Sequence, residues 1–110
     1  MARTSRTAHV RATPTGEVVI GVRGGGRATV SLRSAWRIPS RWLGGARPRI
    51  VRFGQRDVDL RPGTTTDVTF RLSKDHLALL RRMQAVRATI RVQTDDRVRT
   101  RWVWLHPPVR

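Results

Sequence analysis

A pair of carboxylates, Asp57 and Asp59, is the pattern in this chain that comes closest to a catalytic site. Residues two apart on a strand share one face, so the pair could act as a general acid and base. No histidine or metal-ligating residue lies nearby in the sequence, and three arginines surround the pair. We therefore expect both carboxylates to be solvated partners of arginines on neighbouring strands.

The other side chains with catalytic potential are scattered. His9, His76 and His106 fall in the N-terminal segment, a predicted helix and the C-terminal tail, so their spacing is not that of a metal site. Cysteine is absent, which removes thiolate chemistry and cysteine-ligated zinc. The sequence also has no recognisable set of serine, histidine and acid. We therefore expect a protein that is not an enzyme and uses no cofactor or metal.

Three consecutive glycines, Gly24 to Gly26, could in principle cradle a phosphate. A phosphate-binding loop opens a helix, whereas a strand-like run follows these glycines. Alternating apolar residues in 17–22 and 28–33 predict two strands that line one core. We expect the glycines to form a hairpin turn between these strands.

Charge is the strongest feature of the composition, because 23 basic residues face seven acidic ones and the formal net charge is +16. Such a surplus draws a protein to anionic partners. Nucleic acid, an acidic protein surface, an acidic cell-wall polymer and anionic lipid all fit this charge, and a homo-oligomer is compatible with the sequence. No run approaches the roughly 18 apolar residues of a membrane span. With no signal peptide evident, we expect a cytoplasmic or virion location.

The first 16 residues are small, polar and basic, with Arg3, Arg6 and Arg11 spaced among them. They carry too little apolar surface to offset the entropy of ordering, so we expect a flexible basic N-terminal arm at residues 1–16. This arm is either a tether into an anionic surface or a solvated tail.

An irregular segment after the second predicted strand contains Trp36, Arg37, Arg41, Trp42 and Arg47. Tryptophan beside arginine in a loop is typical of a binding surface. The alternative is that one tryptophan is the buried centre of the fold and the other covers its edge. We name these five residues and the three arginines of the arm as candidate partner-binding residues.

Alternation of apolar and polar residues predicts about seven strands. The segments are 17–22, 28–33, 49–53, 56–60, 65–72, 86–93 and 97–105. We expect 49–53 and 56–60 to form a hairpin that turns at Gly54 and Gln55, and Ser73 to cap a short helix. The last strand has two candidate inner faces, one with Trp102 and Trp104 and the other with Val103, Leu105 and several arginines. A β-bulge would reconcile them, and without one either the tryptophans or Val103 and Leu105 are exposed.

Five runs of this chain together resemble the bacterial Ig-like modules that are common in actinobacterial proteins. They are residues 60–63, 68–73, 79–82, 86–92 and 98–102. The resemblance covers about residues 49–105, with a looser match over 17–33, and it carries no catalytic residues. It implies an all-β, Ig-like antiparallel sandwich at 17–105 with one short crossover helix, followed by a C-terminal tail at 106–110. The alternative is an OB-like barrel of five strands, but the helix here follows the fifth predicted strand.

These observations favour a non-enzymatic binding protein. The first hypothesis is a structural or decorating module that docks on a larger assembly, such as a virion or surface layer, through its basic faces and tails. Capsid decoration is one such role. The alternative is a nucleic-acid-binding protein that uses an Arg/Trp surface.

Overall fold

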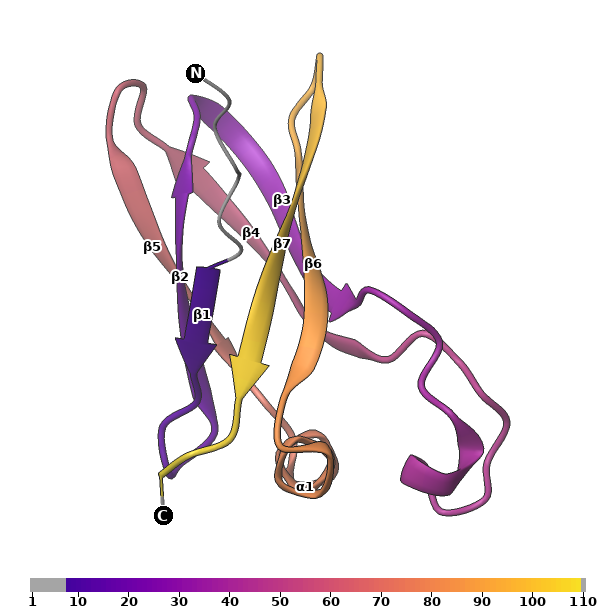
Figure 1. Cartoon of the computed structure of the whole chain (residues 1–110). Coiled ribbons are helices and arrows are strands. Elements are labelled where there is room, and N and C mark those ends of the chain that lie inside the picture. The colour runs from indigo at the N-terminus through magenta and orange to yellow at the C-terminus, as the bar shows by residue number, and fades with distance from the viewer. Residues whose placement is uncertain (1–7, 110) are drawn as a thin grey trace, which may run out of the picture.

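The structure is a computed structural model that describes residues 8–109. Within these residues two sheets pack face to face, and one α-helix closes the lower end of the sandwich (Figure 1). The five-stranded sheet has the order β1-β7-β6-β3-β4, and the second sheet pairs β2 with β5. The elements are β1 (Ala8–Arg11), β2 (Glu17–Arg23), β3 (Gly26–Ser34), the 3-10 turn η1 (Ser40–Trp42), β4 (Arg52–Leu60), β5 (Thr65–Arg71), α1 (Lys74–Met83), β6 (Val86–Gln93) and β7 (Val98–His106). The predicted all-β sandwich is confirmed, and the OB-like barrel is wrong because the strands form two separate sheets.

The core lies between the two sheets because apolar side chains at alternate positions of β2, β3, β5 and β6 point inward. β6 shows the pattern most fully, with Val86, Ala88, Ile90 and Val92 all buried. Complete burial of a side chain of this size contributes about 1.5–3 kcal/mol. Period-two alternation is thus the main link from this sequence to its fold.

Helix α1 carries the chain from β5 in the small sheet to β6 in the large one (Figure 1). Ser73 caps it as predicted, since its hydroxyl accepts a hydrogen bond from the backbone N–H of His76 at 3.1 Å. Leu79 and Leu80 are the buried residues of the helix. Gln84 ends the helix in a left-handed conformation with φ of 71°.

The glycine loop at residues 24–25 connects the two sheets and does not form the predicted hairpin turn. β2 pairs with β5, whereas β3 pairs with β4 and β6. The predicted alternation in β2 and β3 is confirmed, because both strands bury their apolar residues in one core. They reach that core from opposite sides, which a periodic pattern cannot distinguish from adjacent pairing.

The predicted hairpin at residues 49–60 is also wrong. β4 runs without a turn through Gly54 and Gln55 and pairs along its length with β3, with a register shift at Leu32 and Arg33. Gly54 serves a different purpose, since a Cβ placed there would lie 2.8 Å from Cδ1 of Phe70. The glycine therefore admits a core ring from the opposite sheet and is not a turn residue.

The expected flexible arm contains a strand. β1 pairs in parallel with β7, from Ala8 beside Val103 to Arg11 beside His106, so the expectation is wrong for residues 8–11. Ala12 is buried as well. Arg3 and Arg6 lie outside the described residues.

β7 pairs with β6 in one continuous register, and the bulge considered for it does not occur. Val103 and Leu105 are fully buried, whereas Trp102 is 42% exposed. The two tryptophans therefore occupy the outer face of the sheet. Arg99 and Arg101 share the inner face with Val103 and Leu105 by strand alternation.

Three arginines of the large sheet, which we call the bridging arginines, reach across to main-chain carbonyls of the small sheet. The bonds run from Arg99 Nη2 to the carbonyl of Arg23, from Arg101 Nη2 to that of Gly21 at 2.7 Å, and from Arg56 Nη1 to that of Thr69 at 2.9 Å. The small sheet has only two strands, so inner positions near the edges of the large sheet lack a full apolar cover. Arginine suits these positions because its long stem packs while its head finds acceptors.

Candidate docking surface

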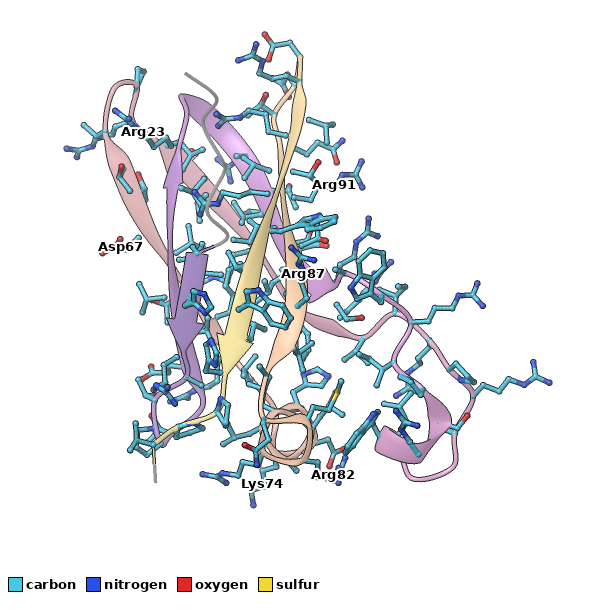
Figure 2. All side chains as sticks on the ribbon, viewed as in Figure 1. Arg23, Asp67, Lys74, Arg82, Arg87 and Arg91 are labelled. Atoms are coloured by element: carbon cyan, nitrogen blue, oxygen red, sulfur yellow. The ribbon has the colours of Figure 1, made fainter. Side chains whose placement is uncertain are left out.

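On the outer face of the five-stranded sheet, Trp102 and Trp104 lie against Arg87, which is labelled in Figure 2, and Trp36 meets Trp102. We call Trp36, Arg87, Trp102 and Trp104 the Trp/Arg cluster. The guanidinium carbon of Arg87 lies 4.1 Å from the centre of the Trp102 ring and 5.4 Å from that of Trp104. Trp36 meets Trp102 edge to face, with ring centres 5.6 Å apart and planes at 72°. These are favourable geometries for cation–π and aromatic contacts.

Strand register assembles this cluster. Arg87 of β6 stands beside Trp104 of β7, and Thr89 stands beside Trp102. All four lie on the outer face because the intervening residues of both strands are buried. The tight β6–β7 connection at residues 94–97 fixes this register, and with it the position of the guanidinium over the rings.

Trp36 comes from the loop after β3, and a buried serine positions it. Ser34 is 2% exposed. Its hydroxyl donates to the carbonyl of Trp36 at 2.7 Å and accepts from the backbone N–H of Val51 at 2.9 Å. The backbone N–H of Ala35 donates to the carbonyl of Arg87 at 2.8 Å. Interior contacts therefore hold the start of this loop against the sheet, although the loop itself projects away from the sandwich (Figure 1).

Two rings of the cluster are exposed, whereas Arg87 and Trp104 are half-buried. Trp36 is 57% exposed and Trp102 is 42% exposed. Neither β6 nor β7 contains an acidic residue. Asp57 and Asp59 of the same sheet lie on β4 at its opposite edge. Exposed aromatic rings beside positive charge that no acidic residue offsets are typical of a surface that binds an anionic partner.

A histidine pair borders the cluster. His9 Nδ1 and His106 Nε2 are 2.8 Å apart, and the rings stack with centres 5.1 Å apart. His9 stands beside Trp104 in the β1–β7 register. Burial lowers the pKa of His106, and the neighbouring His9 and Arg11 lower this pKa further. A hydrogen bond between two imidazoles requires that at least one of them be neutral.

The predicted partner-binding residues separate into different places. Trp36 joins the Trp/Arg cluster, whereas Trp42 is partly buried against the core and accepts a hydrogen bond from Arg82 at its carbonyl. Arg41 lies over the Trp42 ring at 5.5 Å. Arg37 and Arg47 are exposed on the same loop. Arg11 is exposed on β1 and donates to the carbonyl of Pro107 at 2.8 Å.

Sequence reasoning missed Arg87, Trp102 and Trp104 as site residues. A signal for them existed, because an unbulged β7 places both tryptophans on one face and a tight turn pairs them with the outer residues of β6. The arginines on the other face of β7 obscured it, since they made that face look solvent-exposed.

Of the histidines that the sequence scatters, His9 and His106 meet across β1 and β7, whereas His76 and Asp57 lie elsewhere in residues 8–109. Asp57 accepts a hydrogen bond from the hydroxyl of Thr29 at 2.8 Å, where an arginine partner was expected. His76 packs edge to face on Phe53, with ring centres 5.2 Å apart. Burial lowers the pKa of His76, Arg49 adds to this lowering, and Asp75 opposes both. This described part of the chain has no group of three or more potential metal ligands.

Fold and surface together define a small all-β sandwich, consistent with an Ig-like fold, that carries an exposed aromatic and basic face. The chain matches no protein-family model, no curated protein and no solved structure. Over residues 8–109, none of the helices has the length and apolar character needed to cross a membrane.

Proposed function

We propose that this protein is a non-catalytic docking module that attaches a rigid sandwich to an acidic protein surface on a larger assembly. The observation that carries the proposal is the exposed Trp36–Trp102 pair with Arg87 lying over the Trp102 ring. Tryptophan and arginine are the residues most enriched among those that dominate protein–protein binding energy. Their grouping on one face supports a single docking surface.

Rigidity supports the same role. Trp102 and Trp104 sit on β7, Arg87 sits on β6 and Trp36 sits on a loop fixed by Ser34, so little side-chain or loop ordering remains to oppose binding. Basic residues on the strands around the cluster supply long-range attraction to an acidic partner.

The proposal extends to the setting. The assembly is a virion shell or surface layer, with capsid decoration as one form of the role, and the protein acts in the cytoplasm or on the virion. The family is that of the bacterial, actinobacterial-type Ig-like modules. The proposed setting and family are supported by the sequence resemblance and by the basic composition, with 23 basic and seven acidic residues.

Binding of the whole chain to poly-L-glutamate, measured by isothermal titration calorimetry, tests the surface. Trp36→Ala and Trp102→Ala should each weaken binding by about tenfold or more, because hot-spot truncations cost at least about 1–2 kcal/mol. Arg87→Gln should weaken it similarly, since it removes both the charge and the stacked plane.

Arg61→Gln is the matched control, because Arg61 is exposed but lies outside both the cluster and the predicted partner-binding residues. It removes one charge and should change the affinity by no more than about threefold. If the tryptophan variants bind poly-L-glutamate as well as the control does, the Trp/Arg cluster is not the docking surface.

Nucleic acid is the second candidate partner, since exposed rings beside guanidinium groups form a stacking platform for single strands. An oligothymidylate would then bind more tightly than poly-L-glutamate. Its affinity would fall as a power of salt concentration set by the number of phosphate contacts. Binding of oligothymidylate without this salt dependence would remove the alternative.

A further inference from the structure

An opening of about 300 Å³ lies between the two sheets beside β2, β6 and β7. Its floor is apolar, formed by Val22, Ile90 and Val92, which are core residues. Its rim carries the exposed arginines Arg23, Arg99 and Arg101, together with Thr100. This volume is at the lower end of the range for ligand pockets, about 300–1,000 Å³.

The opening follows from the unequal widths of the sheets. Two strands face five, so the inner surface of β7 is not covered along its whole length. Its inner residues change accordingly from the buried Val103 and Leu105 to the exposed Arg101 and Arg99. The opening therefore lies where the small sheet no longer covers β7, with apolar residues inside and arginines at its entrance.

Two of the rim arginines are already oriented. Arg101 donates through Nη2 to the carbonyl of Gly21 at 2.7 Å, and Arg99 donates through Nη2 to the carbonyl of Arg23. These bonds hold the guanidinium planes at the mouth, and the remaining N–H groups of each plane are suited to a carboxylate. Among residues 8–109, no acidic side chain lines the opening, so no carboxylate of this described part competes for these groups.

We infer that this opening binds the carboxylate of a medium-chain fatty acid, with the hydrocarbon chain against Val22, Ile90 and Val92 and the carboxylate at Arg99 and Arg101. The ligand needs both an apolar chain and a carboxylate. The apolar floor residues offer no hydrogen bond to a polar group, and the rim arginines call for a negative charge. The site lies on the inner face of β7, whereas the Trp/Arg cluster lies on the outer face. The inference is therefore independent of the proposed docking function.

Isothermal titration calorimetry of the full chain with hexanoate, octanoate and decanoate provides the test. Affinity should rise with chain length, by at most about fourfold for each added methylene, until the opening is filled. Octylammonium has the same chain with the opposite charge and should bind at least about tenfold more weakly than octanoate. Equal binding of the two, or no binding of any of the three acids, overturns the inference.

Variants then locate the site. Val92→Phe should fill the opening and abolish octanoate binding. Arg99→Gln with Arg101→Gln should weaken octanoate binding by about tenfold or more, because charged hydrogen bonds are lost. Arg91→Gln is the matched control, since Arg91 neighbours Val92 but projects from β6 on the side away from β2 (Figure 2). The Arg91→Gln protein should bind octanoate with unchanged affinity.

Circular dichroism and thermal unfolding of each variant show whether the fold survives. The two arginine replacements alter exposed side chains, so they keep the test decisive if Val92→Phe does not fold. Unchanged octanoate affinity in a folded Arg99→Gln/Arg101→Gln protein contradicts the assignment of the carboxylate to these arginines. An equal loss of octanoate affinity in the Arg91→Gln protein contradicts it as well.

Discussion

Ser34→Ala should both destabilise the protein and loosen the attachment of the Trp36 loop to the sheet. The hydroxyl is buried and makes two hydrogen bonds, at 2.7 Å to the Trp36 carbonyl and at 2.9 Å from the Val51 N–H. Val51 is itself only 4% exposed, so its N–H would lose the hydroxyl as an acceptor in a site closed to water. An unsatisfied buried donor costs about 1–3 kcal/mol. Alanine fits the space, so no steric term is added.

Urea unfolding followed by far-UV circular dichroism measures the change in the free energy of unfolding. A loss of about 1–3 kcal/mol corresponds to a fall in Tm of roughly 4–12 °C for a domain near 100 residues. The m-value should stay constant, because the surface exposed on unfolding is nearly unchanged. Hydrogen exchange should also quicken at Val51, whose amide loses its acceptor.

Ser31→Ala is the matched control. Ser31 lies on the same strand but on the outer face, beside Arg91 and Gln55 of the neighbouring strands. Its replacement should cost no more than about 0.5 kcal/mol. Should Ser34→Ala be as mild as Ser31→Ala, the buried hydroxyl does not fix the loop, and the account of how Trp36 is positioned fails.

Three further perturbations follow from the packing and from the histidine pair. Gly54→Ala should cost about 1–3 kcal/mol in urea unfolding, because the new Cβ would lie 2.8 Å from Cδ1 of buried Phe70; a neutral effect would show that the ring moves freely. The pKa of His106 is lowered on folding, so the unfolded chain binds more protons, and the free energy of unfolding should decrease as pH falls below about 6.5. Replacing His9 and His106 by asparagine should reduce that slope between about pH 5 and 7, and an unchanged slope would contradict the assignment. Arg56→Met should cost at most about 1 kcal/mol, since the lost bond to β5 is solvent-exposed, and a larger loss would show that the bond is more than a surface contact.

Local patterns predicted most elements of this fold, but not β1 or the unbroken course of β4. The alternation of Val86, Ala88, Ile90 and Val92 specifies a strand with one buried face, and Ser73 begins the helix where its hydroxyl can cap it. Partners were harder to predict. The pairing of β2 with β5 joins residues about 50 positions apart, and the sequence between them contains no cue that β3 belongs to the other sheet.

Individual residues were misread where their role is set by a distant neighbour. The sequence alone indicates that Gly54 is a turn residue. The structure shows that its role is to make room for the ring of Phe70. Residues 8–11 are too short and polar to order alone, and they form a strand only because β7 offers them a template.

The loop context predicts Trp36 as a site residue, but the sequence does not assign Trp102 and Trp104 to one face, because arginine is rare inside a sandwich. Arg101 resolves the ambiguity, since its guanidinium reaches the Gly21 carbonyl across the sheets. That acceptor is 80 residues away in sequence, so a local pattern does not show it.

The bridging arginines have a consequence for solubility. Both strands of a two-stranded sheet are edge strands, and the unpaired carbonyls of edge strands are templates on which other chains aggregate. Arg99 and Arg101 occupy carbonyls of β2, and Arg56 occupies one of β5. Part of the basic excess therefore blocks strand addition, whatever partner the outer face binds. Neutralising these three arginines to lower the charge should leave the sandwich folded but prone to self-association.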